Sequence, residues 1–162
     1  MSTGRFLAVA LLACVVLSEG CGRAPQPAIT TAQPADETFK DFGNYEMHFN
    51  AVRTDFLQPE VAREFGIKRS QNRVMLNVAI LHKEAAHAPR KPVEAKVDVD
   101  CYNLNGQLKN MEIRRVTEGD AIYYIGEVTI AGDEILVFDI TATPTGETAP
   151  LDAKLKREFV SN

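Results

Sequence analysis

Residues 93–103 read Val-Glu-Ala-Lys-Val-Asp-Val-Asp-Cys-Tyr-Asn (VEAKVDVDCYN), and their alternation decides the fold class. Every second side chain from Val93 to Cys101 is apolar, whereas the four between them are charged. Successive side chains of a strand point to opposite faces of a sheet, so this period of two predicts a strand with one buried face. Asn105-Gly106 is the pair that a two-residue type I′ hairpin favours, so residues 107–116 are expected to return as the partner strand.

The same pattern extends to both sides of this stretch. Residues 45–51 and 151–160 alternate in the same way, and residues 121–130 and 134–143 form two further β-prone runs between turn-forming glycines. Residues 74–82 are apolar on both faces apart from Asn77, which predicts a central strand covered on both sides. Residues 39–162 are therefore expected to form a single all-β domain, an immunoglobulin-like antiparallel β-sandwich of about seven strands with one short crossover helix.

The crossover helix is predicted between the first strand and the central one. Pro59 occupies a first helical position, Glu60 an early turn, and Gly66 follows the end, which are start and stop signals for about two helical turns. A polar, basic stretch follows as far as Arg73. We call residues 59–73 the crossover. Long connections between strands are where a sandwich commonly displays its binding residues.

The N-terminal residues predict export. Residues 6–17 form a twelve-residue apolar run, shorter than the ~20 residues of a membrane-spanning helix and of the length of a signal-peptide core. Cys21 follows Gly20 in a sequence that resembles a lipoprotein processing site, so residues 1–21 are expected to end in a lipidated cysteine. The alternative is ordinary signal peptidase cleavage after Ser18, which would release a soluble periplasmic protein. Residues 22–38, with three prolines, are expected to form a linker.

The charge of the chain argues against one class of partner. The formal net charge of -4 argues against nucleic acid as a partner, because phosphate binding needs a basic face.

Cys101 is the one cysteine of the 39–162 domain and falls on the apolar side of its strand, so we interpret it as a buried core residue. Tyr123 and Tyr124 are neighbours on a strand, which predicts one in the core and one at its rim.

Chemistry-bearing motifs are absent from the sequence. It contains no Gly-x-Ser-x-Gly, His-Glu-x-x-His or phosphate-binding glycine loop, so no catalytic residue and no cofactor are predicted. The candidate ligands for a metal ion are the three histidines of the chain, His48, His82 and His87.

The basic part of the crossover is the better binding candidate. It places three positive charges and several hydrogen-bonding side chains within six residues, which suits a carboxylate or phosphate group on a partner. The residues expected to bind are Lys68, Arg69, Ser70 and Arg73. The alternative interpretation is a solvated face whose arginines pair with Glu60 and Glu64.

Several segments together resemble one bacterial family. They include residues 42–45 (FGNY), 56–62 (FLQPEVA), 66–70 (GIKRS) and 118–124 (EGDAIYY). The chain is similar over nearly its whole body to the small exported proteins grouped as domain of unknown function family 4426. The resemblance implies a Gram-negative envelope protein and supplies no reaction or catalytic residue.

These observations favour binding over catalysis. We expect a lipoprotein that faces the periplasm, held at the outer membrane by its N-terminal lipid, with an envelope protein as its partner. The alternative is a periplasmic protein that handles a small ligand or a metal ion.

Overall fold

The computed structural model describes residues 38–85 and 88–160. Its strands are β1 (Phe39–Asp41), β2 (Tyr45–Arg53), β3 (Arg73–His82), β4 (Lys91–Pro92), β5 (Ala95–Asn103), β6 (Leu108–Lys109), β7 (Ile113–Glu118), β8 (Ala121–Thr129), β9 (Glu134–Pro144) and β10 (Leu151–Phe159). The 3-10 turn η1 (Thr54–Phe56) and the helix α1 (Pro59–Glu64) lie between β2 and β3. In this described part, no helix has the length and apolar character needed to cross a bilayer.

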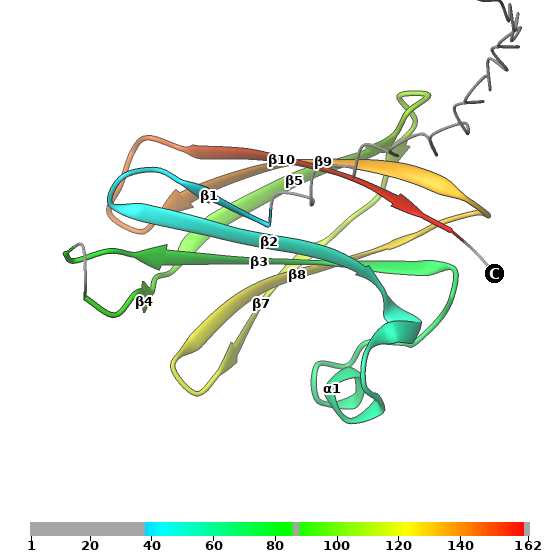
Figure 1. The fold of residues 1–162 in the computed structure, drawn as a ribbon, viewed down its shortest axis with the longest axis horizontal. Helices are drawn as coiled ribbons and strands as arrows, with labels where there is room; N and C mark the ends of the chain where they lie inside the picture. The colour runs from blue at the N-terminus through cyan, green and yellow to red at the C-terminus, as the bar shows by residue number, and fades with distance from the viewer. Residues whose placement is uncertain (1–37, 86–87, 161–162) are drawn as a thin grey trace, which may run out of the picture. The chain divides into compact units, whose positions relative to one another are not determined.

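The strands form two antiparallel sheets packed face to face. Sheet A has the order β1-β2-β3-β8-β7, with β4 also paired to β3, and sheet B has the order β10-β9-β5-β6. Figure 1 shows the two layers, with α1 on the side of sheet A that faces away from sheet B. The predicted all-β sandwich with one short crossover helix is confirmed, and three short strands (β1, β4 and β6) add to the seven expected.

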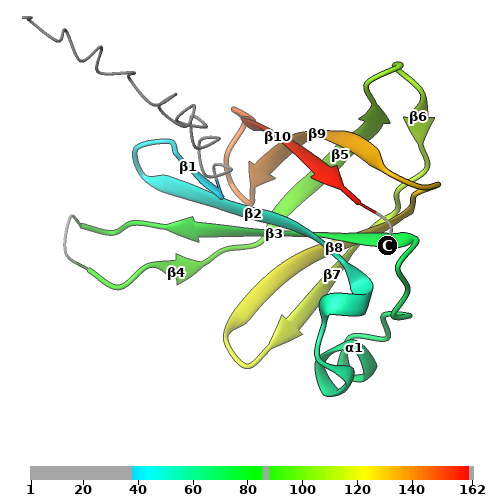
Figure 2. The same ribbon diagram turned by 45° about the vertical axis from the view of Figure 1, so that its right-hand side comes forward.

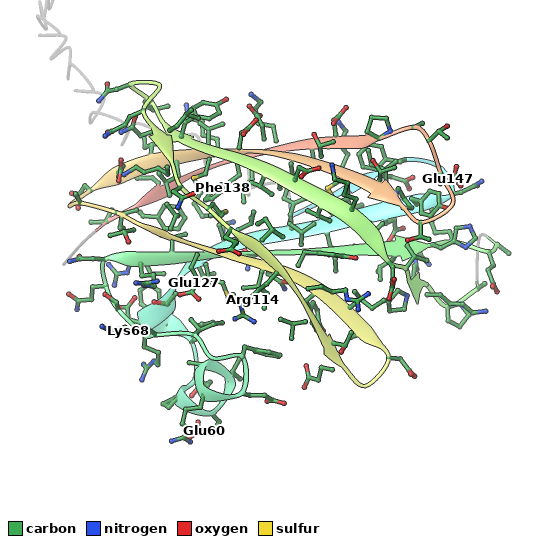
Figure 3. All side chains as sticks on the ribbon, turned by 180° about the vertical axis from the view of Figure 1, so that it is seen from behind. Glu60, Lys68, Arg114, Glu127, Phe138 and Glu147 are labelled. Carbon is green, nitrogen blue, oxygen red and sulfur yellow. The ribbon has the colours of Figure 1, made fainter. Side chains whose placement is uncertain are left out.

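The core lies between the sheets and follows the alternation of the sequence. Phe138 of β9 lies there (Figure 3). It is fully buried, as are Met47 of β2 and Leu76 and Ile80 of β3. Burying one such side chain stabilises the folded state by about 1.5–3 kcal/mol. The inward positions of β10 are buried as predicted: Leu151, Ala153, Leu155 and Phe159.

Cys101 is a core residue, and its thiol is expected to be unreactive in the folded protein. It is 1% exposed, and burial raises the pKa of the thiol to about 11 from an ordinary 9.0. Since the thiolate is the reactive form, labelling by dithiobisnitrobenzoate at about pH 8 should be at least about 100-fold slower than in the unfolded chain. The measurement uses the Cys14→Ser, Cys21→Ser chain with and without denaturant. Equal rates in the two conditions would contradict the buried position.

The prediction of one return strand over residues 107–116 is wrong. The segment forms β6, which pairs with β5 in sheet B, and then β7, which pairs with β8 in sheet A. Gly126 of β8 permits this change of sheet, because a Cβ atom there would lie 2.6 Å from Ile113 Cδ1 and 2.7 Å from Met111 Cγ. The side chains of Met111 and Ile113, where the chain passes from sheet B to sheet A, therefore occupy the space that a side chain at position 126 would fill.

The hairpin loop before β6 also differs from the two-residue prediction. The Asn103 N–H donates to the Gln107 carbonyl at 3.1 Å, so residues 104–106 form the loop. The Asn103 Oδ1 accepts from the N–H groups of Asn105 and Gln107 at 3.1 and 3.0 Å. The Asn103 side chain thus supports a backbone turn in which the Gly106 N–H donates to the Asn103 carbonyl at 2.9 Å.

Candidate functional site

Sheet A divides into a fork along the second half of β3. The β3–β8 ladder runs from Arg73–Thr129 to Val78–Tyr124, and farther along β3 the residues Leu81 and His82 pair with β4 instead. β8 continues to Ala121 paired only with β7. Figures 1 and 2 both show the β7–β8 hairpin diverging from β3 and from β4 beside it.

A groove of about 530 Å³ occupies this fork on the outer face of sheet A. Its size falls in the range of about 300–1,000 Å³ that is usual for ligand sites. None of its lining side chains carries a carboxylate, an ammonium or a guanidinium group. The lining residues are Thr38, His48, Phe49, Asn50, Asn77, Ala79, Leu81, Pro92, Ala121, Ile122 and Tyr123.

The groove exists because the crossover covers only half of the outer face. Ala62 and Ile67 of the crossover pack on Ile125 of β8, with Met75 of β3 and Tyr123 against the same cluster. Beyond these contacts the outward side chains of β3 form the floor of the groove. The residues 74–82 are therefore central, as predicted, but the prediction that both faces are covered is wrong for their second half.

Tyr123 and Tyr124 divide between groove and core, which confirms the core-and-rim prediction. Tyr124 is 5% exposed and belongs to the main core, where its hydroxyl accepts a hydrogen bond from the Ala95 N–H at 2.7 Å. Tyr123 lies on the opposite face and lines the groove beside the crossover. One strand position thus contributes to the core and the next lines the groove.

Asn77 places an unsatisfied polar atom at the floor of the groove. Its Oδ1 is buried and has no hydrogen-bond partner in the described part of the chain. Buried polar groups are nearly always hydrogen-bonded, since an unmade bond costs about 1–3 kcal/mol. The terminal torsion of asparagine has broad preferences, so a small rotation of the amide presents Oδ1 to a ligand that donates a hydrogen bond.

A network of charges lies on the same face of β2, next to the groove. Glu46 is 7% exposed, and its Oε1 accepts from Arg90 Nη2 at 3.0 Å and lies 3.8 Å from Lys83 Nζ. Its Oε2 lies 3.2 Å from Nε2 of His48, a residue that lines the groove. Lys83 also contacts Asp41 of β1 at 2.6 Å. Two carboxylates and two cations therefore balance one another at this end of the groove.

This network predicts a loss of stability in acid. Hydrogen bonds from Arg90 and then His48 lower the pKa of Glu46 below its ordinary 4.5. A lowered folded-state pKa contributes stability above the unfolded pKa, and that contribution is lost as the pH falls through the folded value. Urea unfolding between about pH 3 and 7 should show Glu46→Gln less stable than the native protein near neutrality, with the difference shrinking in acid. A pH-independent difference would contradict this role.

The histidines predicted to bind metal do not converge within the described residues. His48 lies on the outer face of β2, while His82 follows the inward parity of β3 and contacts Tyr45, with 5.0 Å between ring centroids. His87, like Cys21, lies outside the described residues. Among described residues, no group of three or more histidine, cysteine, aspartate or glutamate side chains is placed to hold a metal ion.

The basic residues of the crossover make contacts within the chain. Arg73 Nη1 lies 3.3 Å from Glu127 Oε2, and Arg69 Nη2 donates to the Asp55 carbonyl at 2.7 Å. These partners differ from the Glu60 and Glu64 that the solvated-face interpretation named. The Ser70 N–H donates to the buried Thr54 hydroxyl at 2.9 Å.

Lys68 differs from the other basic residues of the crossover. Its side chain is exposed, and none of the ion pairs among the described residues involves it. Figure 3 shows Lys68 and Glu60 on the crossover and Glu147 at the opposite end of the sandwich. The predicted basic cluster is therefore divided between internal bonds and one exposed ammonium group.

The groove residues Asn77 and Tyr123, and Glu46 next to the groove, were not among the binding residues predicted from the sequence. Asn77 had a visible signal, since it is the one polar side chain between Val74 and Leu81. The position of Glu46 beside Arg90 depends on two segments 44 residues apart, which local pattern does not relate.

Comparison with known proteins finds solved structures of the same fold. No curated protein matches it. Two crystal structures of FetP from uropathogenic Escherichia coli strain F11 share the fold at a TM-score of 0.54. One is FetP as isolated after expression in the periplasm, 10% identical, covering 76% of this chain and 93% of that chain. The other is a copper-bound variant, 11% identical, covering 76% and 95%.

A nearer relative comes from Pseudomonas aeruginosa PAO1. The crystal structure of its DUF4426 family protein is 32% identical, has a TM-score of 0.65, and covers 78% of this chain and 96% of that chain. The model of the family described as "Domain of unknown function (DUF4426)" matches residues 39–161. Both findings confirm the resemblance seen in the sequence, and the chain belongs to the DUF4426 family.

Proposed function

We propose that the protein is an exported, non-catalytic binding module of the cell envelope that holds a protein partner in the groove of sheet A. The observation that supports this most strongly is the groove itself, with an uncovered apolar floor and the unsatisfied Asn77 Oδ1. A contiguous apolar surface left open along a central strand is typical of an interaction site. An unsatisfied carbonyl at the same place adds a group that only a ligand or a rotation satisfies.

The proposed location rests on the N-terminal sequence. Residues 1–21 have the length and apolar core of a signal peptide, and Cys21 is the proposed lipidated residue that anchors the protein at the outer membrane, facing the periplasm. Labelling cells with a radioactive or clickable palmitate analogue tests this part. Label on the native protein and none on Cys21→Ser is the expected result. An unlabelled native protein would leave the soluble periplasmic alternative.

In-cell photocrosslinking tests the groove. Benzoylphenylalanine replaces Tyr123, a wall of the groove, or Lys156, an exposed residue of β10, as the matched control. We expect one discrete envelope protein crosslinked from position 123 and none from position 156. The substitution Ala79→Phe fills the groove from its floor and should abolish the crosslink. The same products from both positions, or none from position 123, would overturn the proposal.

The crossover remains a second proposed contact surface for the same partner. Lys68 forms none of the ion pairs found among the described residues, whereas Arg69 and Arg73 bond within the chain. Lys68→Glu should therefore weaken the position-123 crosslink if the partner also touches the crossover. An unchanged crosslink would confine the interface to the groove.

The alternative function, handling of a small ligand or metal, is supported by one observation. A copper-bound variant of FetP has the same fold as this chain. Copper titration of the purified protein tests it, with His48→Ala and His82→Ala compared to the native chain. Binding of one equivalent that is lost in either variant would favour this alternative. Failure of the native protein to bind copper would remove the copper form of this alternative.

A further inference from the structure

The open edge of β8 offers backbone hydrogen bonds to the groove. In an antiparallel ladder, alternate residues direct their N–H and C=O groups to opposite neighbours. The Ile130 N–H donates to the Asn72 carbonyl at 3.0 Å, so the even-numbered residues of β8 face β3. Tyr124 is the last of these that has a β3 partner. Ile122, two residues farther on, therefore directs its N–H and C=O groups into the fork.

The corresponding position on β3 is already occupied from the other arm. The Ile80 carbonyl accepts from the Val93 N–H at 3.0 Å, next to β4. The Ile80 carbonyl of β3 is thus already hydrogen-bonded by the segment that leads into β5. Within the described residues, no strand pair provides a partner for the Ile122 N–H and C=O groups that face the fork. An extended peptide that enters the fork can form a short strand beside β8, the mode known as β-strand addition.

Charges at the mouth of the fork distinguish one end from the other. Glu118 and Asp120 are exposed on the β7–β8 turn, directly before Ala121 of the groove, and form none of the ion pairs found in the described part of the chain. On the other arm, Arg90 contacts Glu46 and Lys91 contacts Glu84. The turn end of the β7–β8 arm is therefore acidic and without ion pairs among the described residues, the cations of the β4 arm are paired, and no charged side chain lines the groove between them.

We propose that the groove binds an extended peptide segment of the partner, uncharged in its centre and with a lysine or arginine at the end beside Glu118 and Asp120. The inference rests on the proposed function and names the chemistry of the partner. The centre of the segment exchanges hydrogen bonds with the backbone of Ile122 and donates one to Asn77 Oδ1. The cation pairs with the acidic turn.

Fluorescence anisotropy with the protein purified from the cell envelope tests the inference. The probe is a fluorescein-labelled peptide, Lys-Ala-Thr-Val-Thr-Ala-Gly, and its control has Glu in place of Lys. We expect the Lys probe to bind more tightly than the Glu control. Reversing both acids with Glu118→Lys and Asp120→Lys should weaken the Lys probe about tenfold, since two exposed ion pairs become repulsive. The matched control combines Glu64→Lys and Glu158→Lys, which changes the net charge equally on α1 and β10.

A second readout locates the peptide. Hydrogen exchange of the Ile122 amide should slow on addition of the Lys probe, while the amides of β10 should not change. The inference is overturned if the native protein binds neither peptide, if both peptides bind equally, or if the control variant loses as much affinity as the acid reversal. It is also overturned if deleting residues 22–37 raises the affinity for the probe about tenfold. That result would mean that the chain's own linker occupies the groove and competes with the peptide.

The two proposals fail in different ways. If the peptides do not bind but position 123 still crosslinks a discrete partner, the groove is an interface and the peptide chemistry is wrong. If position 123 crosslinks nothing and the probe does not bind, the proposed function is wrong as well.

Discussion

Replacing Thr54 by valine is expected to lower the free energy of unfolding by about 3 kcal/mol, although the two side chains have nearly the same shape. The Thr54 side chain is fully buried. Its Oγ1 accepts from the Ser70 N–H at 2.9 Å, and its proton lies within reach of the carbonyls of Lys68 and Ser70 at 2.9 and 3.2 Å. Valine fills the space and leaves these backbone groups without their partner, and each unmade bond costs about 1–3 kcal/mol.

The control for this prediction is Thr54→Ser, which keeps the hydroxyl and removes one methyl group. It should cost about 1 kcal/mol. Urea unfolding of both variants, followed by circular dichroism, measures the difference. If the two substitutions lower the free energy of unfolding equally, the Thr54 hydroxyl does not hold the crossover in place.

The Thr54 substitution also affects the proposed site. Thr54 fixes residues 68–70, and the adjoining Ile67 packs with Ala62 on Ile125, in the cluster that includes the groove wall Tyr123. Loosening this anchor should weaken the crosslink from position 123 more than a substitution of equal cost in the core, such as one at Leu155. Equal effects would indicate that stability alone determines binding.

The strands with one buried face could be predicted from the sequence because their periodicity is local. The alternation of residues 45–51 and 93–101 predicted β2 and β5. Pro59 and Gly66 predicted the start and the end of α1. The change of sheet between β6 and β7 could not be predicted, because it depends on Gly126, a residue that reads locally as part of an ordinary strand. The fork in sheet A depends likewise on β4 displacing β8 from β3, which no local pattern records.

The groove was not predicted from the sequence, which pointed to the crossover instead. The crossover was identified correctly, but its arginines were assigned to a partner or to Glu60 and Glu64. In the structure, Arg73 reaches Glu127, 54 residues away, and Arg69 reaches a backbone carbonyl. Long side chains choose their partners from three-dimensional neighbours. The tyrosine pair was predicted correctly because opposite facing of adjacent residues is a property of any strand.

Asn77→Leu is expected to stabilise the protein and at the same time to abolish binding in the groove. Leucine has nearly the shape of asparagine, so the strand and its neighbours need not move. The substitution removes the buried Oδ1 that has no partner in the described part of the chain, which should raise the free energy of unfolding by about 1 kcal/mol. For a domain of this size the melting temperature should rise by about 3–5 °C.

The opposite signs make this substitution informative. Replacing a residue that serves only the structure lowers the stability of the protein. Replacing a residue that serves binding can instead raise the stability of the free protein. Thermal unfolding and the position-123 crosslink, measured on the same Asn77→Leu preparation, should therefore move in opposite directions. Asn50→Leu is the matched control, because Asn50 lies opposite Asn77 on β2 and its Oδ1 already accepts from Arg157 at 2.6 Å. Its replacement should lower stability, since an existing bond is lost. If Asn77→Leu is destabilising, or leaves the crosslink intact, Asn77 is not a binding residue of the groove.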